Sequence, residues 1–251
     1  MKTDLFSIGS FTVHGYGLMI GIGFILAMLL AEYMAKKLGL REESIIDITI
    51  IAGVSGFLGA KLLYIIVEFD TFIKDPKAVL GSAGFVVYGG IIAGVLCCMF
   101  YCRIKKLNFL EYFDLVMPEI ALAQGFGRIG CFLAGCCYGK ETSGAFSITF
   151  HTSAFAPNGV ALVPTQIYSS ILDFLHYGLL LLILRSQKKD GETAAAYLIF
   201  YSAGRFVLEF FRGDLARGSV GVLSTSQFIS VFTFLAGIVL LVQRKHALER
   251  V

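Results

Sequence analysis

Seven long apolar runs constrain the fold of this 251-residue chain more than any other feature of its sequence. Hydrophobic residues make up 57% of the chain and charged residues only 16%, which is too apolar for an ordinary water-soluble domain. Each run is close to the roughly 20 residues that a helix needs to cross a hydrocarbon core of about 30 Å. The predicted spans are 16–37, 44–68, 83–103, 112–134, 164–185, 193–211 and 224–243. We therefore predict an all-α, polytopic membrane protein with about seven transmembrane helices.

The positive charges predict the orientation of these spans. When the Lys and Arg residues are sorted by loop, twelve fall on one side of the membrane, six on the other, and three lie within spans. The richer side is predicted to be cytoplasmic, because cytoplasmic loops carry an excess of Lys and Arg. The N-terminus is then outside and the C-terminus is cytoplasmic. We also predict a single integral membrane domain over 1–251, no cleavable signal peptide, and an extracytoplasmic loop region at 135–163.

Two arginines are predicted to lie inside the membrane. Arg128 belongs to the fourth span and Arg205 to the sixth, and each lies about 9 Å below the outer end of its span at a rise of about 1.5 Å per residue. A charge at such a position costs about 2.5–3.5 kcal/mol on insertion scales. A guanidinium is planar, always charged and able to bind phosphate with two hydrogen bonds. We therefore predict that Arg128 and Arg205 face one cavity and bind a phosphate group there.

Other polar side chains are predicted at a similar depth. Tyr16 begins the first span, while Lys61 and Tyr88 lie in the outer parts of the second and third spans. We expect these residues and the two arginines to form a binding layer beneath the outer headgroups. Structural roles remain open for each residue alone, because isolated cations often extend to the headgroups and tyrosines often anchor a span at the interface.

Glycines next to these side chains allow two interpretations. Gly127 and Gly130 flank Arg128, and Gly89 and Gly90 follow Tyr88. Small residues let membrane helices pack closely. They also let backbone N–H groups reach a bound anion. Both interpretations can hold at once.

The sixth span carries a series of charges. Arg205, Glu209 and Arg212 have the spacing i, i+4 and i+7, which places them on one face of a helix. We predict that they pair in series and that Glu209 orients Arg205. The alternative is an ion ladder with a purely structural role.

Three of the six cysteines lie at the outer end of the fourth span. Cys131, Cys136 and Cys137 allow three interpretations, namely packing, an extracytoplasmic disulfide, and a reactive thiol or metal site. Their spacing matches no strong zinc pattern, and no histidine is close in sequence. We favour packing or a disulfide, and we predict no metal and no cofactor. No basic patch for nucleic acid is present either.

Several short motifs occur along the chain. The most specific begins Gly127-Arg128-Ile129-Gly130 and extends to Gly139. The others are Tyr16–Met19, Tyr88–Gly90, Pro164–Tyr168, Gly204–Phe206 and Glu209–Arg212. Together they spread over most of the chain, and in residues and order they resemble the prolipoprotein diacylglyceryl transferase family.

This resemblance implies a seven-helix enzyme of the bacterial cytoplasmic (inner) membrane. Such an enzyme moves a diacylglyceryl group from phosphatidylglycerol to the thiol of a lipobox cysteine in a preprolipoprotein signal peptide, and glycerol phosphate leaves. The implied partners are therefore phosphatidylglycerol, these signal peptides and membrane lipids. We predict Arg128, Arg205 and Tyr88 as catalytic residues, with Tyr88 hydrogen-bonding the thiol or an ester oxygen. The predicted substrate-binding residues are Tyr16, Lys61, Gly89, Gly90, Gly127, Gly130, Gln166, Glu209 and Arg212.

The chain also departs from the family pattern. Cys131 and Ala134 stand where the family signature has Asn, and Cys136 stands where it has Glu. Tyr88 and Val163 occupy positions where His is common, and Ser169 one where Glu is common. The phosphate-binding arginines are retained, whereas a histidine base and a carboxylate are missing. The alternatives are a family paralogue with another acceptor, a lipid or small-anion transporter using the same cationic layer, and a sensory or structural membrane protein.

Overall fold

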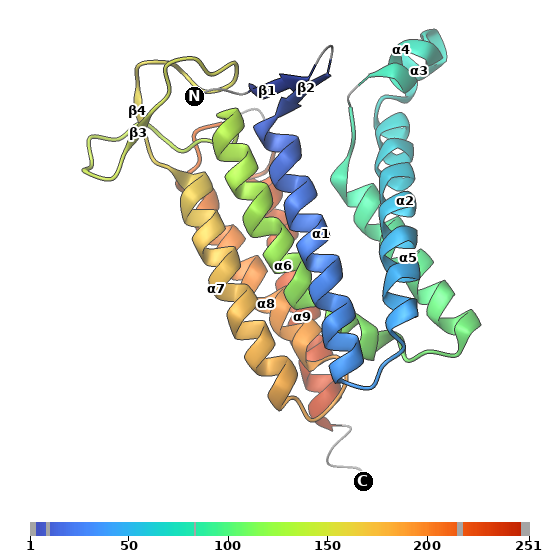
Figure 1. Cartoon of the computed structure of the whole chain (residues 1–251). Helices are drawn as coiled ribbons and strands as arrows, with labels where there is room; N and C mark the ends of the chain where they lie inside the picture. Colours follow the sequence, from blue (N-terminus) through green and yellow to red (C-terminus); the bar gives the residue numbers. More distant parts are fainter. Residues whose placement is uncertain (1–3, 9–10, 83, 215–217, 247–251) are drawn as a thin grey trace. The chain divides into compact units, whose positions relative to one another are not determined.

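The structure is a computed structural model that describes residues 4–8, 11–82, 84–214 and 218–246, and it is mostly helical (Figure 1). Lys2, Arg217 and Arg250, which contribute to the predicted orientation, lie outside these ranges. The helices are α1 (Gly15–Lys37), α2 (Glu42–Val67), α3 (Phe69–Lys74), α4 (Pro76–Gly81), α5 (Val87–Lys105), α6 (Phe109–Ala134), α7 (Thr165–Ser186), α8 (Glu192–Glu209) and α9 (Thr225–His246). Three antiparallel two-stranded sheets join β1 (Asp4–Ile8) to β2 (Phe11–His14), β3 (Ile148–Thr149) to β4 (Ala161–Leu162), and β5 (Ser219–Val220) to β6 (Leu223–Ser224).

Each of the seven predicted spans corresponds to one long helix. Five of the described helices, α1, α2, α5, α7 and α9, are long and apolar enough to cross a membrane. Helices α6 and α8 are not among them, and both contain ionisable residues, including Arg128 and Arg205. The predicted class, an all-α polytopic membrane protein, is confirmed. The predicted orientation stays a prediction.

The chain divides into two compact units. The first unit comprises Met1–Ala31 and Phe113–Val251, and the second comprises Glu32–Tyr112. The single membrane domain therefore stays a prediction, and the two units are described separately.

In the second unit, α2 packs closely against α5 through glycines. A Cβ atom added at Gly59 would collide with the backbone of Gly89, and one added at Gly90 would lie 2.6 Å from the carbonyl oxygen of Gly56. The helix backbones are therefore in direct contact along this seam, which only residues without a side chain permit.

In the first unit, polar side chains link the helices in pairs. The carboxylate of Asp114 on α6 accepts hydrogen bonds from the backbone N–H groups of Gly191 and Ala194, at the N-terminus of α8. Ser170 on α7 donates to the carbonyl oxygen of Gly125 on α6 at 2.9 Å. These bonds satisfy polar groups inside the bundle and fix α6 against α7 and α8.

The predicted loop region at 135–163 contains the β3–β4 hairpin and a small core of its own. Phe150, Ala156 and Leu162 are buried together there. Gly139 and Val163 continue the hydrogen bonding at the base of this region, where the N–H of Gly139 donates to the carbonyl oxygen of Val163 at 3.1 Å. The segment is therefore folded against itself, and its extracytoplasmic position stays a prediction.

Candidate active site

Arg128 and Arg205 line one cavity of about 250 Å³ among α6, α7 and α8 in the first unit. Most of its wall is apolar, and the polar side chains form a small group within it. The lining residues are Arg128, Ser169, Leu172, Asp173, Leu175, His176, Leu179, Phe200, Tyr201, Gly204, Arg205 and Leu208. Residues from three helices therefore place two guanidinium groups in one apolar setting.

Arg205 is held in place by two neighbours. Its Nη1 atom lies 2.6 Å from Oε2 of Glu209, one turn further along α8, and its Nη2 atom donates to the hydroxyl of Ser226 on α9 at 2.9 Å. The side chains of Arg205 and Glu209 are only 13% and 8% exposed. Glu209 thus orients Arg205 and offsets its charge, in the arrangement that the i, i+4 spacing predicts.

In the described part of the chain, Arg128 lacks the ion pair that fixes Arg205. Arg205 pairs with Glu209 and Arg212 pairs with Asp214, whereas Arg128 forms no ion pair with a described residue. It interacts electrostatically with Tyr201, Cys131 and Asp173. Because no carboxylate of the described residues is bonded to this partly buried cation, its N–H donors remain available to an anion in the cavity.

A polar stripe on α7 was predicted from sequence only at Gln166, and its other members were missed. Gln166, Ser169, Ser170, Asp173 and His176 are all buried. Their spacing of three or four residues inside an apolar run is the signal that could have revealed this stripe, because it places them on one helical face.

The aromatic side chains of α8 position two cavity residues. The ring of Tyr197 stacks on His176 at a centroid distance of 5.3 Å and on Tyr201 at 5.4 Å. The Tyr197 hydroxyl donates to Oε1 of Gln124 at 3.1 Å. His176 and Tyr201 therefore face the cavity from the two ends of a fixed stack.

The predicted series of ion pairs on the sixth span is wrong for Arg212. Helix α8 ends at Glu209, so Arg212 lies beyond it and forms a β-bridge with Gly139 instead of continuing the helical face. Its guanidinium pairs with Asp214 through Nε and Nη2, at 2.9 and 2.7 Å. Arg212 therefore links the chain after α8 to the segment after α6.

Four other predicted residues lie around Arg128 in the first unit. Gly130 packs against the backbone of Tyr16, because an added Cβ atom would lie 3.1 Å from the Tyr16 carbonyl oxygen. A Cβ atom added at Gly127 would meet nothing within 4 Å. Tyr16 interacts electrostatically with Arg128. Gln166 is buried, and its Nε2 atom donates to the carbonyl oxygen of Cys136 at 2.8 Å. These contacts suit packing and positioning, and the predicted binding roles stay predictions.

The remaining predicted residues belong to the second unit. The Nζ atom of Lys61 donates to the carbonyl oxygen of Ser82 at 2.8 Å and lies over the rings of Tyr64 and Phe85. Gly89 and Gly90 form the contact between α5 and α2, and Tyr88 is partly exposed on α5. Their predicted roles at the arginine site stay predictions.

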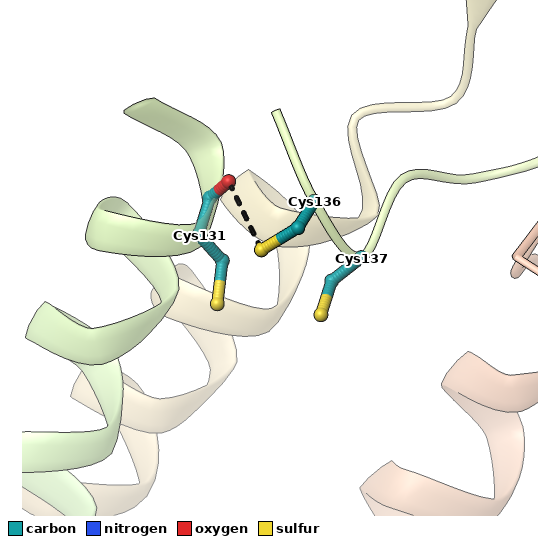
Figure 2. Close-up of side chains that lie close together, drawn as sticks. All are labelled: Cys131, Cys136 and Cys137. Carbon is teal, nitrogen blue, oxygen red and sulfur yellow. Dashed lines mark hydrogen bonds between the residues drawn. The ribbon is translucent and has the colours of Figure 1, made fainter. Parts of the chain in front are cut away.

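Three cysteines converge where α6 ends (Figure 2). Gly135 has a φ of +73°, and the N–H groups of Gly135 and Cys136 donate to the carbonyl oxygens of Phe132 and Cys131, both at 3.1 Å. This pair of bonds is a Schellman motif, which returns the chain over the last turn of the helix. It brings Cys136 beside Cys131, and the sulfurs of Cys131, Cys136 and Cys137 all lie within 4.8 Å of one another.

The thiols of this cluster influence one another and contact an arginine. Hydrogen bonds from the Cys131 and Cys136 thiols and from Arg212 lower the pKa of Cys137. Contact with Cys131 and Cys137 raises the pKa of the Cys136 thiol. All six cysteines are thiols in this structure, and the predicted alternatives of packing and a disulfide stay predictions.

The fold and the cavity define a polytopic membrane protein with a buried site carrying two arginines. The prolipoprotein diacylglyceryl transferase family model matches residues 3–243. The chain belongs to this family, as the sequence motifs predict.

Three relatives cover nearly the whole chain. It is 48% identical over 240 residues to the phosphatidylglycerol–prolipoprotein diacylglyceryl transferase of Clostridium tetani, covering 95% of this chain and 96% of the relative. It is 49% identical over 243 residues to the phosphatidylglycerol–prolipoprotein diacylglyceryl transferase 2 of Clostridium perfringens, covering 96% of this chain and 94% of the relative. It is 35% identical over 248 residues to the phosphatidylglycerol–prolipoprotein diacylglyceryl transferase of Finegoldia magna, covering 98% and 96%.

Proposed function

We propose that this chain transfers a diacylglyceryl group from phosphatidylglycerol to the thiol of a lipobox cysteine in a prolipoprotein, and that it works in the bacterial cytoplasmic membrane. One observation carries the proposal: Arg128 and Arg205 line the same largely apolar cavity, in a member of the transferase family. The two guanidinium groups match the anionic phosphate of such a lipid, and the apolar wall excludes water around it.

The two arginines act on the leaving group. The acceptor sulfur attacks the glycerol carbon that bears the phosphate ester, and the bond from that carbon to the phosphate oxygen breaks. Negative charge grows on the departing glycerol phosphate, and preorganised guanidinium groups in an apolar site stabilise it strongly. Arg205 supplies a donor fixed by Glu209 and Ser226, while Arg128 supplies one whose N–H groups are not engaged by a carboxylate in the part of the chain that the structure describes.

The size of the cavity limits what it holds. About 250 Å³ is below the roughly 300–1,000 Å³ of pockets that enclose a drug-sized ligand. The cavity therefore suits the phosphate and glycerol part of the lipid, and the acyl chains remain in the bilayer. In this proposal Tyr88 hydrogen-bonds the acceptor thiol or an ester oxygen.

A transfer assay with defined substrates tests the proposal. The purified protein is incubated in detergent with phosphatidylglycerol and a lipobox peptide, and the peptide is analysed by mass spectrometry. We expect the mass of one diacylglyceryl group on the cysteine and release of glycerol phosphate. An unmodified peptide, together with flux of lipid in vesicles containing the protein, would contradict the proposal and favour transport.

A further inference from the structure

The three thiols at the end of α6 have the spacing of a metal-binding site. Their sulfurs lie within 4.8 Å of one another. Three thiolates bound to Zn²⁺ at about 2.3 Å would have their sulfurs roughly 3.8–4.0 Å apart. Small side-chain rotations therefore suffice to bring Cys131, Cys136 and Cys137 to one ion.

The backbone holds these thiols in position from several sides. Cys137 has a φ of +61°, a left-handed conformation that costs a non-glycine residue on the order of 1–3 kcal/mol. The Thr165 hydroxyl donates to the carbonyl oxygen of Cys137 at 2.9 Å, and Gln166 donates to that of Cys136 at 2.8 Å. Two buried side chains of α7 thus fix a strained turn, which packing of small residues alone does not require.

A disulfide explains the cluster less well than a metal ion does. Cys136 and Cys137 are adjacent, and Cα atoms across a trans peptide are about 3.8 Å apart, below the usual disulfide range of about 4.4–6.8 Å. A bond from Cys131 to either neighbour leaves the third thiol unused. Three soft sulfur donors suit a thiophilic ion such as Zn²⁺ or Cu⁺.

The charges around the cluster suit bound thiolates. Three thiolates and one Zn²⁺ carry a net charge of −1, which needs a positive neighbour in a partly buried site. Arg212 hydrogen-bonds to Cys137, and Arg128 interacts electrostatically with Cys131 and Cys137. The cluster is therefore coupled to the cavity that holds the proposed phosphate.

We propose that Cys131, Cys136 and Cys137 bind one thiophilic metal ion of the Zn²⁺ class, and that its fourth coordination position accepts the thiol of the incoming acceptor cysteine. The second part rests on the proposed transferase function. Three protein ligands with one open position are typical of catalytic rather than structural zinc sites.

The step balances without an oxidant or reductant. The acceptor thiol binds Zn²⁺ as a thiolate and releases its proton to solvent, because a metal-bound thiol is deprotonated. The sulfur electron pair forms the new bond to the glycerol carbon, and the phosphate oxygen leaves with the electron pair of the broken bond. The product is an uncharged thioether, which binds Zn²⁺ weakly and dissociates.

Metal binding is tested first, without any activity measurement. The full-length protein is purified in detergent under reducing conditions, depleted with a chelator, and titrated separately with Zn²⁺ and Co²⁺. We expect about one Zn²⁺ per chain by elemental analysis and thiolate-to-metal absorption bands with Co²⁺. Cys137→Ser and Cys131→Ser should lose both signals, whereas Cys97→Ser, an exposed cysteine on α5, should keep them.

The wild-type titration keeps the proposal falsifiable even if a variant fails to fold. Absence of bound metal and of cobalt bands in the wild-type protein would overturn the proposal. A mass two hydrogens lower in the protein purified without reductant, retained when Zn²⁺ is added, would also overturn it in favour of a disulfide.

The transfer assay then tests the role of the fourth position. We expect the chelated protein to lose transfer activity by at least tenfold, to recover it with Zn²⁺, and to show no recovery in Cys137→Ser. Equal transfer with and without bound metal would overturn this role and leave the transferase proposal intact. No transfer by the zinc-loaded protein would instead contradict the transferase function, and the binding data would still decide the metal site.

Discussion

At the scale of single residues, the two cavity arginines differ in how they are held. Arg205 is fixed between Glu209 and Ser226, whereas the ion pairs among the described residues leave Arg128 out. A partly buried cation without a bonded carboxylate is unfavourable, and a bound phosphate would offset part of that cost. We infer that Arg128 makes the stronger contribution to binding of the anionic group.

Replacing Arg128 by Lys tests this inference. Lysine keeps the charge but loses the planar fork that binds two phosphate oxygens at once. We expect kcat/KM for phosphatidylglycerol to fall by at least about 100-fold, near the 10²–10³ loss seen when one donor to a developing anion is removed. Lys36→Arg, at the far end of α1, is the matched control and should retain activity. Transfer near the wild-type rate by Arg128→Lys would count against the two-arginine site.

Asp173 is the acidic residue that can act as a counter-charge for Arg128. It is buried on α7, lines the cavity, and interacts electrostatically with Arg128. Asp173→Asn should reduce kcat/KM about tenfold, because Arg128 loses its orienting charge while the phosphate site remains. Ser186→Ala, at the exposed end of the same helix, should leave the rate unchanged. An undiminished rate in Asp173→Asn would remove Asp173 from the site.

At the scale of helices, glycines of α2 and α5 let these two helices pack with their backbones in contact. Gly59 and Gly89 lie backbone to backbone, so a side chain at either position must separate the helices. Backbone approach of this kind replaces the hydrophobic driving force, which is weak between helices already in lipid.

A substitution at Gly59 measures this contact. Gly59→Val should destabilise the protein by about 1–3 kcal/mol, because the new side chain meets the backbone of Gly89 and cannot be accommodated by a rotamer change. Thermal unfolding in detergent should show a clearly lower midpoint. Gly53→Val on the same helix, where an added Cβ atom has nothing within 4 Å, is the control and should unfold near the wild-type midpoint. Equal midpoints for both variants would show that the seam contributes little.

The helices were predictable from sequence, and the ends of helices were not. Apolar run length determines a span, so all seven long helices have the predicted positions. The end of α8 depends on the turn at Phe210 and the bridge between Arg212 and Gly139, which are contacts between distant segments. Helical periodicity alone therefore placed Arg212 on the wrong face.

Residues of the candidate site were predictable where their charge or polarity contrasted with the apolar sequence around them. Arg128 and Arg205 stood out because a charge in an apolar run is expensive. Asp173 and His176 lie in a run that also contains several leucines, and their meaning comes from the cavity on their side of α7. The convergence of three cysteines depends on the turn after α6, so sequence spacing alone did not favour a metal site.

At the scale of the whole molecule, the functional groups of the first unit gather near one set of helix ends. Arg128 lies about two turns from the C-terminus of α6 and Arg205 about one turn from the C-terminus of α8. The cysteine cluster and Arg212 lie just beyond these ends. The side of the membrane that these ends face therefore decides which substrates can reach the site.

The predicted orientation places these ends outside the cytoplasm, where an exported prolipoprotein arrives. The opposite end of α7 is followed by Lys188 and Lys189, and such clusters are retained in the cytoplasm. Alkaline phosphatase is active only when exported, and green fluorescent protein made in the cytoplasm fluoresces there. Fusions of each after Ser143, in the segment between α6 and α7, and after Lys189 report the side of both ends. We expect phosphatase activity at Ser143 and fluorescence at Lys189. The reverse pattern would place the arginine cavity near the cytoplasmic face, where the lipobox cysteine of an exported substrate could not reach it.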